Sequence, residues 1–400
     1  MKILGINFGS SKPEPLPIQP TVQKDLTDTF HFVSQNSYAP STSSYQYSGD
    51  MVKWGNNNLY PLDLDDFYKS SPIHSSIVKQ KSNLVIGEGI DYTKFSGLTS
   101  EQQTSLLQFD AFVDAYGKTL FEVSEELALD YQVFGGMAIE VVWDMTFTRI
   151  IQVNRIPMMN VRLTKEQPNG TIQRFLYNKN WLRPSENGTV SIPAFDINNK
   201  EETNQLIFIK NPSLDGRYYP ECPYQSGLNW IDVDASISRF HKSNIQNGFS
   251  PSLAFKFYTQ PETPELKAKA VREIENSFSS PSNAGRAMVF FSDGKDTATD
   301  IETIQTANID KVFTVVHDQV IDQITRAHRV PSGILFNVLN STSKLSLAGE
   351  YEESFKIFEK TVISQDRKKL EGVLNKILKI NGIDAGLRFK PYQVYNNQIN

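Results

Sequence analysis

The sequence predicts an α+β fold, in which a region of short strands and helices is followed by long helices. Apolar residues recur at steps of three and four over 101–134, 227–247 and 308–330, which predicts helices. MAIEVVWD, residues 137–144, predicts a strand, and the chain up to residue 208 continues in short pieces separated by the turns PNG, SENG and INN. Strands and helices do not alternate regularly, so we do not expect a doubly wound parallel sheet.

Composition and charge exclude several classes of protein. No window approaches the roughly 18 to 20 apolar residues of a membrane-spanning helix, and the N-terminus, MKILGINFGSSK, lacks the long apolar run of a secretory signal. The single cysteine, Cys222, excludes a disulfide framework and favours a reducing compartment. A net charge of −5 argues against a protein that grips nucleic acid through a basic surface, but still allows one that merely surrounds DNA.

The N-terminal segment has no sustained periodicity. Residues 1–50 contain PEPLPIQP and STSSYQYS and are rich in Pro, Ser, Thr and Gln, so we expect a flexible arm, with order starting near Met51. In the helix that follows, Ser71 is a candidate N-cap and Pro72 occupies the first helical position. The later helical pattern ends at the pair of glycines just before MAIEVVWD.

Two long helices of matched length are predicted in the second half of the chain. The first ends at Gly248 and Pro251, since glycine adopts the left-handed conformation of a helix end and proline cannot continue the helix. The second ends before Pro331, because a residue that precedes proline is disfavoured in the helical region. Acidic residues near the helix starts, such as Asp234, and basic residues near the ends, such as His328, complement the helix dipoles. Each helix has about 21 residues and spans about 30 Å.

A small strand–helix–strand unit connects these two helices. Strands are predicted near 252–258 and at AMVFF, residues 287–291, and a helix that starts at Pro264 separates them. The apolar stripe of that helix consists of Leu266, Ala270, Ile274 and Phe278. The sequence thus predicts a small unit carried at the end of two long helices.

A polar loop follows the second long helix. Residues 331–347 mix Asn, Ser and Thr with isolated apolar residues and one charge, Lys344. A loop of this length without regular structure is uncommon between helices and needs a functional or structural explanation. A helix of about thirty residues is then predicted, ending at Asn381 and Gly382. A final strand is expected within LRFKPYQVY.

Several short motifs occur in a specific order along the chain. The first long helix ends in NGFSPS, SNAGR precedes the second strand of the small unit, and the second long helix ends in HRVPSGIL before the polar loop. Upstream stand WGNNNLYP, SPIHSSIVKQKSNLVIGEG, DYQVFGGMAIEV and KNPSLDGRYYPECPYQSGLNWI. This series resembles the portal proteins of tailed bacteriophages over residues 51–390. No single motif is decisive, so the resemblance rests on the order.

The resemblance implies a portal fold of the α+β class and a division of the chain into named parts. The expected parts are a flexible N-terminal arm (1–50), a wing (51–226), a first stem helix (227–249), a clip (250–306), a second stem helix (307–330), a tunnel loop (331–347), and a long wing helix with a short C-terminal crown or strand (348–400). The arm has no counterpart in the resemblance.

The resemblance also implies a structural function. Such proteins form a dodecameric ring at one capsid vertex, and DNA is packaged and ejected through the ring. The expected partners are further copies of the chain, the large subunit of the terminase, the major capsid protein, a neck or adaptor protein, and double-stranded DNA bound without sequence specificity. No enzymatic activity, cofactor, metal or membrane is expected. The chain would be made in the bacterial cytoplasm and reside in the virion.

Three groups of residues are candidate functional sites by this resemblance. Gly248 and Pro251 form a hinge between stem and clip. The exposed face of the clip helix would dock the terminase, although a merely solvated face is the commoner explanation; its residues are Glu265, Lys267, Lys269, Arg272 and Glu273. The residues of the DNA-channel loop are Asn337, Asn340, Ser341, Thr342, Ser343 and Lys344. Their weakly charged character suits a DNA conduit, since many lysine–phosphate contacts would bind tightly and slow sliding.

Two alternatives stay open, a soluble enzyme without a recognisable site and another ring-forming connector of the phage neck. Gly117, Lys118 and Thr119 resemble the end of a phosphate-binding loop, but Phe112 stands where another glycine is required, and the motif lies inside a helical pattern. The histidines and Cys222 lack metal-ligand spacing and are expected to be packing or surface residues. The long helices could also be ordinary bundle helices, and the polar loop a plain connection.

Overall fold

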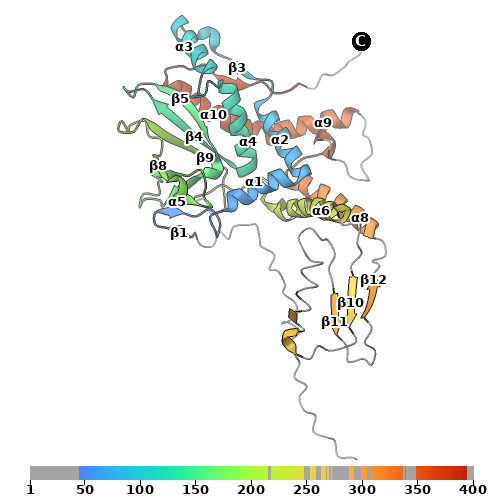
Figure 1. The fold of residues 1–400 in the computed structure, drawn as a ribbon. Coiled ribbons are helices and arrows are strands. Elements are labelled where there is room, and N and C mark those ends of the chain that lie inside the picture. The colour runs from blue at the N-terminus through green and yellow to red at the C-terminus, as the bar shows by residue number, and fades with distance from the viewer. Residues whose placement is uncertain are drawn as a thin grey trace, which may run out of the picture. The chain divides into compact units, whose positions relative to one another are not determined.

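The computed structural model of this 400-residue chain combines helices with mostly antiparallel sheets (Figure 1), which confirms the predicted α+β class. The described residues belong to one unit, Tyr38–Asn400. They are residues 45–214, 218–246, 253–257, 263–266, 268, 269, 272, 288–291, 299–303, 309–336, 338 and 348–393. None of the helices described in these ranges is long and apolar enough to cross a membrane.

The centre of the described unit is helical. It contains α1 (Tyr60–Ser70), α2 (Pro72–Ile86), α4 (Leu120–Phe134) and α10 (Ser364–Ile380), and α2 contacts the other three. Ile77 of α2 and Leu127 of α4 are fully buried. As predicted, α2 starts with Pro72 at its first position, and the Ser71 hydroxyl accepts a hydrogen bond from the His74 N–H at 3.2 Å. The start of α2 is therefore fixed by local sequence chemistry.

Antiparallel sheets flank this helical centre. One sheet has the order β5-β4-β9, with β4 at Gly136–Trp143, β5 at Ile150–Ile156 and β9 at Asn204–Lys210, and α4 packs on it (Figure 1). The strand predicted from MAIEVVWD is confirmed as β4. A second sheet has the order β1-β2-β6-β7-β8, with β1 at Tyr47–Ser48, β2 at Met51–Val52, β6 at Val161–Thr164, β7 at Arg174–Tyr177 and β8 at Val190–Pro193.

The two long helices of the second half are confirmed. They are α6 (Leu228–Gln246) and α8 (Ile309–Ala327), and they contact each other (Figure 1). The chain between them contains β10 (Leu253–Phe257), which pairs in parallel with β11 (Met288–Phe291). On its other side, β10 pairs antiparallel with β12 (Thr299–Thr303), a strand that the sequence did not predict.

The helix predicted over residues 101–134 is wrong as a single element. The structure has α3 (Ser100–Ala111) and α4, separated by residues 112–119. Gly117 has a φ of 81°, which ends any helical path. Thr119 then starts α4, because its side chain accepts from the Glu122 N–H while the Glu122 carboxylate accepts from the Thr119 N–H. The apolar periodicity continues across residues 112–119. The pattern therefore did not reveal that one helix ends and another begins there.

The long C-terminal helix is confirmed, with one irregularity. It runs through α9 (Ala348–Phe358), a π-helical turn (Glu359–Ile363) and α10, and ends at Asn381 and Gly382 as predicted. The predicted final strand is β13 (Leu387–Phe389), which pairs with β3 (Ile90–Tyr92). Further short helices within the described residues include α5 (Pro184–Asn187) and the 3-10 turns Phe95–Gly97, Met158–Asn160, Gln225–Gly227 and Gly333–Phe336.

Candidate functional site: the base of the paired helices

Helix α6 is fixed to α2 through a buried carboxylate. Asp234 is almost fully buried and its Oδ2 accepts hydrogen bonds from the Ser71 hydroxyl at 2.6 Å and from the Ile73 N–H at 3.5 Å. The prediction that Asp234 complements the dipole of its own helix is therefore wrong. The carboxylate instead lies at the N-terminus of α2, where the partial positive charge of that helix stabilises it. One residue thus ties the start of α2 to α6.

Helix α8 is fixed to α2 through two histidines. His74 Nδ1 and His328 Nε2 lie 2.9 Å apart, and both side chains are buried. The Tyr224 ring packs against both imidazoles, with centroid distances of 4.3 Å to His74 and 4.9 Å to His328. The outer nitrogens, His74 Nε2 and His328 Nδ1, have no hydrogen-bond partner among the described residues. His328 is therefore a packing residue, in agreement with the expectation stated for the histidines. The prediction that it places a positive charge at the end of α8 is wrong.

The charge state of this histidine pair follows from its surroundings. Burial, and after it the charge of Lys81, lower the pKa of His74 to about 3. The pKa of His328 is also well below its ordinary value, through burial and the neighbouring His74, Lys81 and Arg329. Burial lowers the pKa of Lys81 itself to about 8, and Asp366 opposes that shift. Both imidazoles are therefore neutral at pH 7.

The C-terminal end of α8 is closed by Arg329. Its φ is 58°, a left-handed conformation that is uncommon for a residue with a side chain. The Arg329 N–H donates to the Arg326 carbonyl at 2.9 Å and the Val330 N–H to the Thr325 carbonyl at 3.1 Å, the paired bonds of a Schellman motif. The prediction that Pro331 ends this helix is wrong, because the turn is completed before the proline is reached.

The first part of the polar loop is packed against the core. Gly333–Phe336 forms a 3-10 turn, and the Val338 N–H donates to the Gly333 carbonyl at 2.9 Å. A Cβ on Gly333 would lie 2.0 Å from the Val338 carbonyl oxygen, so only glycine fits there. The Phe336 ring contacts Phe358 of α9 edge-on at 5.5 Å. The loop is therefore fixed where it leaves α8.

The candidate residues of the DNA-channel loop lie outside the described residues. This applies to Asn337, Asn340, Ser341, Thr342, Ser343 and Lys344. The hinge residues Gly248 and Pro251 also lie outside them, as do Lys267 and Glu273 of the clip helix. Glu265, Lys269 and Arg272 are described, helical and exposed, but Leu266 of the predicted apolar stripe is 51% exposed as well, so exposure does not distinguish the two faces of this helix. The assignment of these residues to DNA or terminase stays a prediction.

The alternatives based on chemistry gain no support from the described residues. The Gly117–Thr119 segment lies in a loop and not inside a helix, which corrects the sequence prediction, but it follows α3 and not the strand that a phosphate-binding loop requires. No group of three His, Cys, Asp or Glu side chains in the described ranges is placed to hold a metal ion. Burial raises the pKa of the Cys222 thiol to about 12, so it is no nucleophile.

Sequence reasoning missed a buried arginine that explains part of the WGNNNLYP motif. Arg162 donates to the Asn58 side chain at 2.6 Å and to the Asn58 carbonyl at 2.8 Å, and its guanidinium lies near the rings of Trp54 and Trp181. Asn58 has a φ of 65°, which Asn tolerates better than most residues. The motif therefore forms a turn that binds Arg162. Asn58 and Arg162 are 104 positions apart, so no local sequence pattern reveals that they pair.

Comparison with known proteins places the chain in a family. The phage portal protein family matches residues 116–394, more than half of the chain. A chain from the neck of the native gene transfer agent particle, computed with C12 symmetry, is 16% identical with a TM-score of 0.56, over 87% of each chain. A chain from the virion of native gene transfer agent particles is also 16% identical, with a TM-score of 0.55 over 86% of each chain.

A further solved structure is an HK97 family phage portal protein from Corynebacterium diphtheriae, 10% identical with a TM-score of 0.44, over 82% of this chain and 94% of that one. A search of curated proteins gave no match. The family match includes α4, the paired helices α6 and α8, the sheet between them and the long C-terminal helix. The two gene transfer agent chains share the fold. The resemblance found in the sequence is thereby confirmed: the chain belongs to the phage portal protein family.

Proposed function

We propose that twelve copies of the chain form a closed ring at one capsid vertex, and that double-stranded DNA passes through its centre during packaging and ejection. The family match and the C12 symmetry of the gene transfer agent neck, whose chain has the same fold, support this number of copies. A heterologous interface repeated by rotation closes into a ring when the rotation returns to its start. The observation that carries the proposal is the pair α6 and α8, both fixed on α2 and joined through a small sheet.

Apolar side chains on the paired helices support an interface between copies. Val315 of α8 is 56% exposed, and Phe240 of α6 is 37% exposed. A neighbouring copy in the proposed ring would cover both side chains, whereas single exposed apolar residues are otherwise normal on a protein surface. Within this proposal α6 and α8 are the stem, the segment between them the clip, and the segment after α8 the tunnel loop. The role is structural, and no described site calls for catalysis.

We assign different partners to the clip and to the wing of each copy. The clip would dock the large terminase subunit during packaging and a neck or adaptor protein afterwards, while the wing would contact the major capsid protein. DNA would pass without sequence specificity, which suits a chain with a net charge of −5 that does not grip phosphates through a basic surface. The chain would be made in the host cytoplasm and reside in the virion.

The mass of the purified chain in solution tests ring formation. We expect particles of twelve times the 45.3 kDa chain mass by mass photometry or native mass spectrometry. A monodisperse monomer at high concentration in several salts would contradict the proposal.

Replacing Lys344 by Glu is expected to lower the amount of DNA packaged per procapsid while rings still form. One lysine per copy would give a ring of weak positive charge at the axis, and its reversal repels phosphate. The measurement is packaged DNA for wild type and variant at low and moderate salt, with the neutral Lys344→Gln as the control, which should fall between them. Equal yields of all three at both salts would show that this side chain does not face DNA.

Reversing two clip charges, Lys269→Glu with Arg272→Glu, is expected to leave rings intact and to weaken terminase binding several-fold. Both residues are exposed on the clip helix, so the substitutions bury no charge. Pull-down of the large terminase subunit by assembled rings measures the effect, and the matched control reverses two exposed charges of the wing, Lys179→Glu with Arg183→Glu. Identical recovery with the clip variant and the wing control would remove the clip helix face from the docking site.

A further inference from the structure

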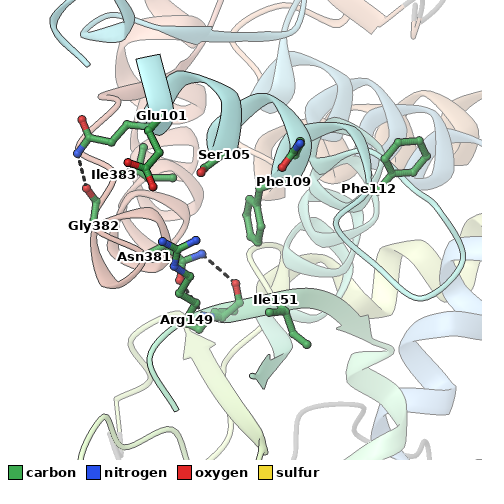
Figure 2. Close-up of a pocket in the computed structure, with 12 residues that line it drawn as sticks. Glu101, Ser105, Phe109, Phe112, Arg149, Ile151, Asn381, Gly382 and Ile383 are labelled. Atoms are coloured by element: carbon green, nitrogen blue, oxygen red, sulfur yellow. Dashed lines mark hydrogen bonds between the residues drawn. The ribbon is translucent and has the colours of Figure 1, made fainter. Parts of the chain in front are cut away.

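The groove shown in Figure 2 has balanced charges. It lies between α3, the start of β5 and the turn after α10, and its volume is about 450 Å³. One charge of each sign, Glu101 and Arg149, stands at its lining, together with the apolar side chains of Phe109, Phe112 and Ile151. These charges favour neither an anionic nor a cationic ligand.

A second cavity, of about 300 Å³, has a positive charge excess. It lies where α10, β13 and β3 contact one another. Its charged lining residues are four cations and two carboxylates: Arg367, Lys368, Arg388 and Lys390, and Asp91 and Glu371. Residues 367–390 contain seven Lys or Arg and two Asp or Glu, although the whole chain has a net charge of −5. A local positive excess of this kind attracts anions.

Three of the four cations are exposed and available. Lys368, Arg388 and Lys390 form no ion pair and no side-chain hydrogen bond with any residue that the structure describes. The fourth cation, Arg367, is buried and is already paired with Glu359. A ligand in this cavity would therefore meet three positive side chains that have no competing partner within the described part of the chain.

The two carboxylates of the lining do not cancel this excess. Glu371 is buried, and its Oε1 accepts a hydrogen bond from the Phe389 N–H at 2.9 Å. Asp91 lies opposite Arg388 in the register of β3 and β13, but no ion pair joins their side chains in the described structure. Four cations and two carboxylates leave the lining with a net charge of +2.

The backbone fixes the positions of two of the exposed cations. Leu387 and Phe389 of β13 are buried. Successive side chains of a strand point to opposite faces, so Arg388 and Lys390 share the outer face. The pairing with the neighbouring chain segment continues past the strand, since the Lys390 N–H donates to the Gly89 carbonyl at 2.9 Å. These two cations therefore stand side by side on a rigid element.

The cavity lies at the other end of α2 from the paired helices. The Arg367 guanidinium donates to the carbonyls of Leu84 and Val85, in the last turn of α2. Ser71 and His74, which bind α6 and α8, stand at the first turn of α2. The fifteen residues of α2 span about 22 Å at 1.5 Å per residue. The cavity is therefore separate from the base of the paired helices.

We propose that this cavity and the outer face of β13 bind the phosphate backbone of double-stranded DNA, at a place separate from the channel. Lysine and arginine side chains are common donors to phosphate oxygens, and such contacts carry no sequence information. Three exposed cations on two rigid elements fit a polyanion that runs across the surface. The choice of DNA rests on the proposed function, because DNA is the polyanion that this function brings to the chain.

Covalently closed circular duplex DNA tests this assignment in the full chain, because a closed circle cannot thread through a closed ring. Filter binding of labelled minicircles between about 50 and 200 mM salt measures the affinity and its salt dependence. The site variant is Lys368→Gln/Arg388→Gln/Lys390→Gln. Thermal unfolding and particle mass, measured on the same samples, report whether each variant folds and assembles.

The matched control removes the same number of positive charges elsewhere. It is Arg149→Gln/Lys179→Gln/Arg183→Gln, and all three side chains are exposed. Arg149 belongs to the groove of Figure 2, and the other two lie between β7 and β8. The site variant and the control thus have the same net charge and differ only in where the charges are lost.

We expect the wild type and the control to bind the circles alike, and the site variant to bind them several-fold more weakly. The slope of log affinity against log salt should flatten by about 0.9 for each phosphate contact that is lost, hence by about 2.7 for each engaged copy. Lys368→Gln alone should flatten it by about 0.9 for each engaged copy.

Equal weakening in the site variant and the control would overturn the proposal, since net charge alone would then govern binding. A wild-type chain that retains no circles at about 50 mM salt would also overturn it. So would loss of DNA binding in millimolar inorganic phosphate at constant ionic strength, because the cavity would then hold a free phosphate ion. Circles bind from outside whether or not rings form, so the particle mass reports separately on the proposed ring.

Discussion

Lowering the pH from 7 to 4.5 is expected to lower the free energy of unfolding by several kcal/mol through the histidine pair between α2 and α8. His74 and His328 are buried, share one hydrogen bond and lie near the charges of Lys81 and Arg329. The folded chain keeps both imidazoles neutral, whereas in the unfolded chain both take up protons below about pH 6.5. Acid therefore favours the unfolded state through these two side chains.

The sign and the pH window follow from the lowered pKa values. The pKa of His74 falls to about 3 in the folded chain, so the stability linked to it is fully present above pH 6.5 and is lost as the pH falls from there toward 3. Each such group contributes a slope of at most about 1.4 kcal/mol per pH unit. Burial raises the pKa of Asp130, and that group acts in the opposite direction. A comparison between variants is therefore needed to isolate the histidines.

Chemical denaturation from pH 7.5 to 4.5 measures the effect in the wild type and in the double variant His74→Leu/His328→Leu. The double variant removes both partners of the hydrogen bond together, which avoids leaving a single buried imidazole unpaired. We expect its stability to fall less steeply with acid than that of the wild type. Parallel pH profiles would show that these histidines do not remain neutral in the folded chain.

Replacing Gly333 by Ala is expected to destabilise the start of the loop after α8 by about 1 to 3 kcal/mol. The added Cβ would lie 2.0 Å from the Val338 carbonyl oxygen, and the obstacle is backbone, which cannot rotate away. The 3-10 turn Gly333–Phe336 and the hydrogen bond from the Val338 N–H would be lost first. If the loop lines a DNA channel, packaging falls while rings persist.

Gly349→Ala is the matched control for this substitution. Gly349 lies on α9, at the other end of the same loop, and nothing lies within 4 Å of the position of an added Cβ. Alanine stabilises a helix interior relative to glycine by up to about 1 kcal/mol, so this variant should be unchanged or more stable. Hydrogen exchange at the Val338 amide and thermal unfolding are the readouts. Unchanged exchange in Gly333→Ala would show that the turn tolerates a side chain.

The helices were predictable from the sequence where local chemistry and apolar spacing agree. Ser71 and Pro72 define the start of α2, and the stripes of α6 and α8 follow a period of 3.6 residues. The break between α3 and α4 was missed because Val113 is buried and Leu120 continues the apolar spacing across the turn. Strand β12, TDIET, was missed because it is short and polar.

The contacts at the base of the paired helices could not be predicted. His74 and His328 are 254 positions apart, and Ser71 and Asp234 are 163 apart, so a pattern within one segment says nothing of either pair. Gly227 illustrates the same limit: it looked like a helix boundary, but it is also where the chain approaches α8, since a Cβ there would lie 2.6 Å from the Ala327 Cβ. Pairings of this kind depend on the complete fold.

Electron cryomicroscopy of the purified chain shows directly whether its copies form a closed ring with a channel. We expect closed rings of twelve copies with a central channel, with α6 and α8 of each copy packed against those of its neighbour through exposed side chains such as Val315. Open filaments, closed particles without a channel, or rings in which these two helices make no contact with the neighbouring copy would contradict this expectation.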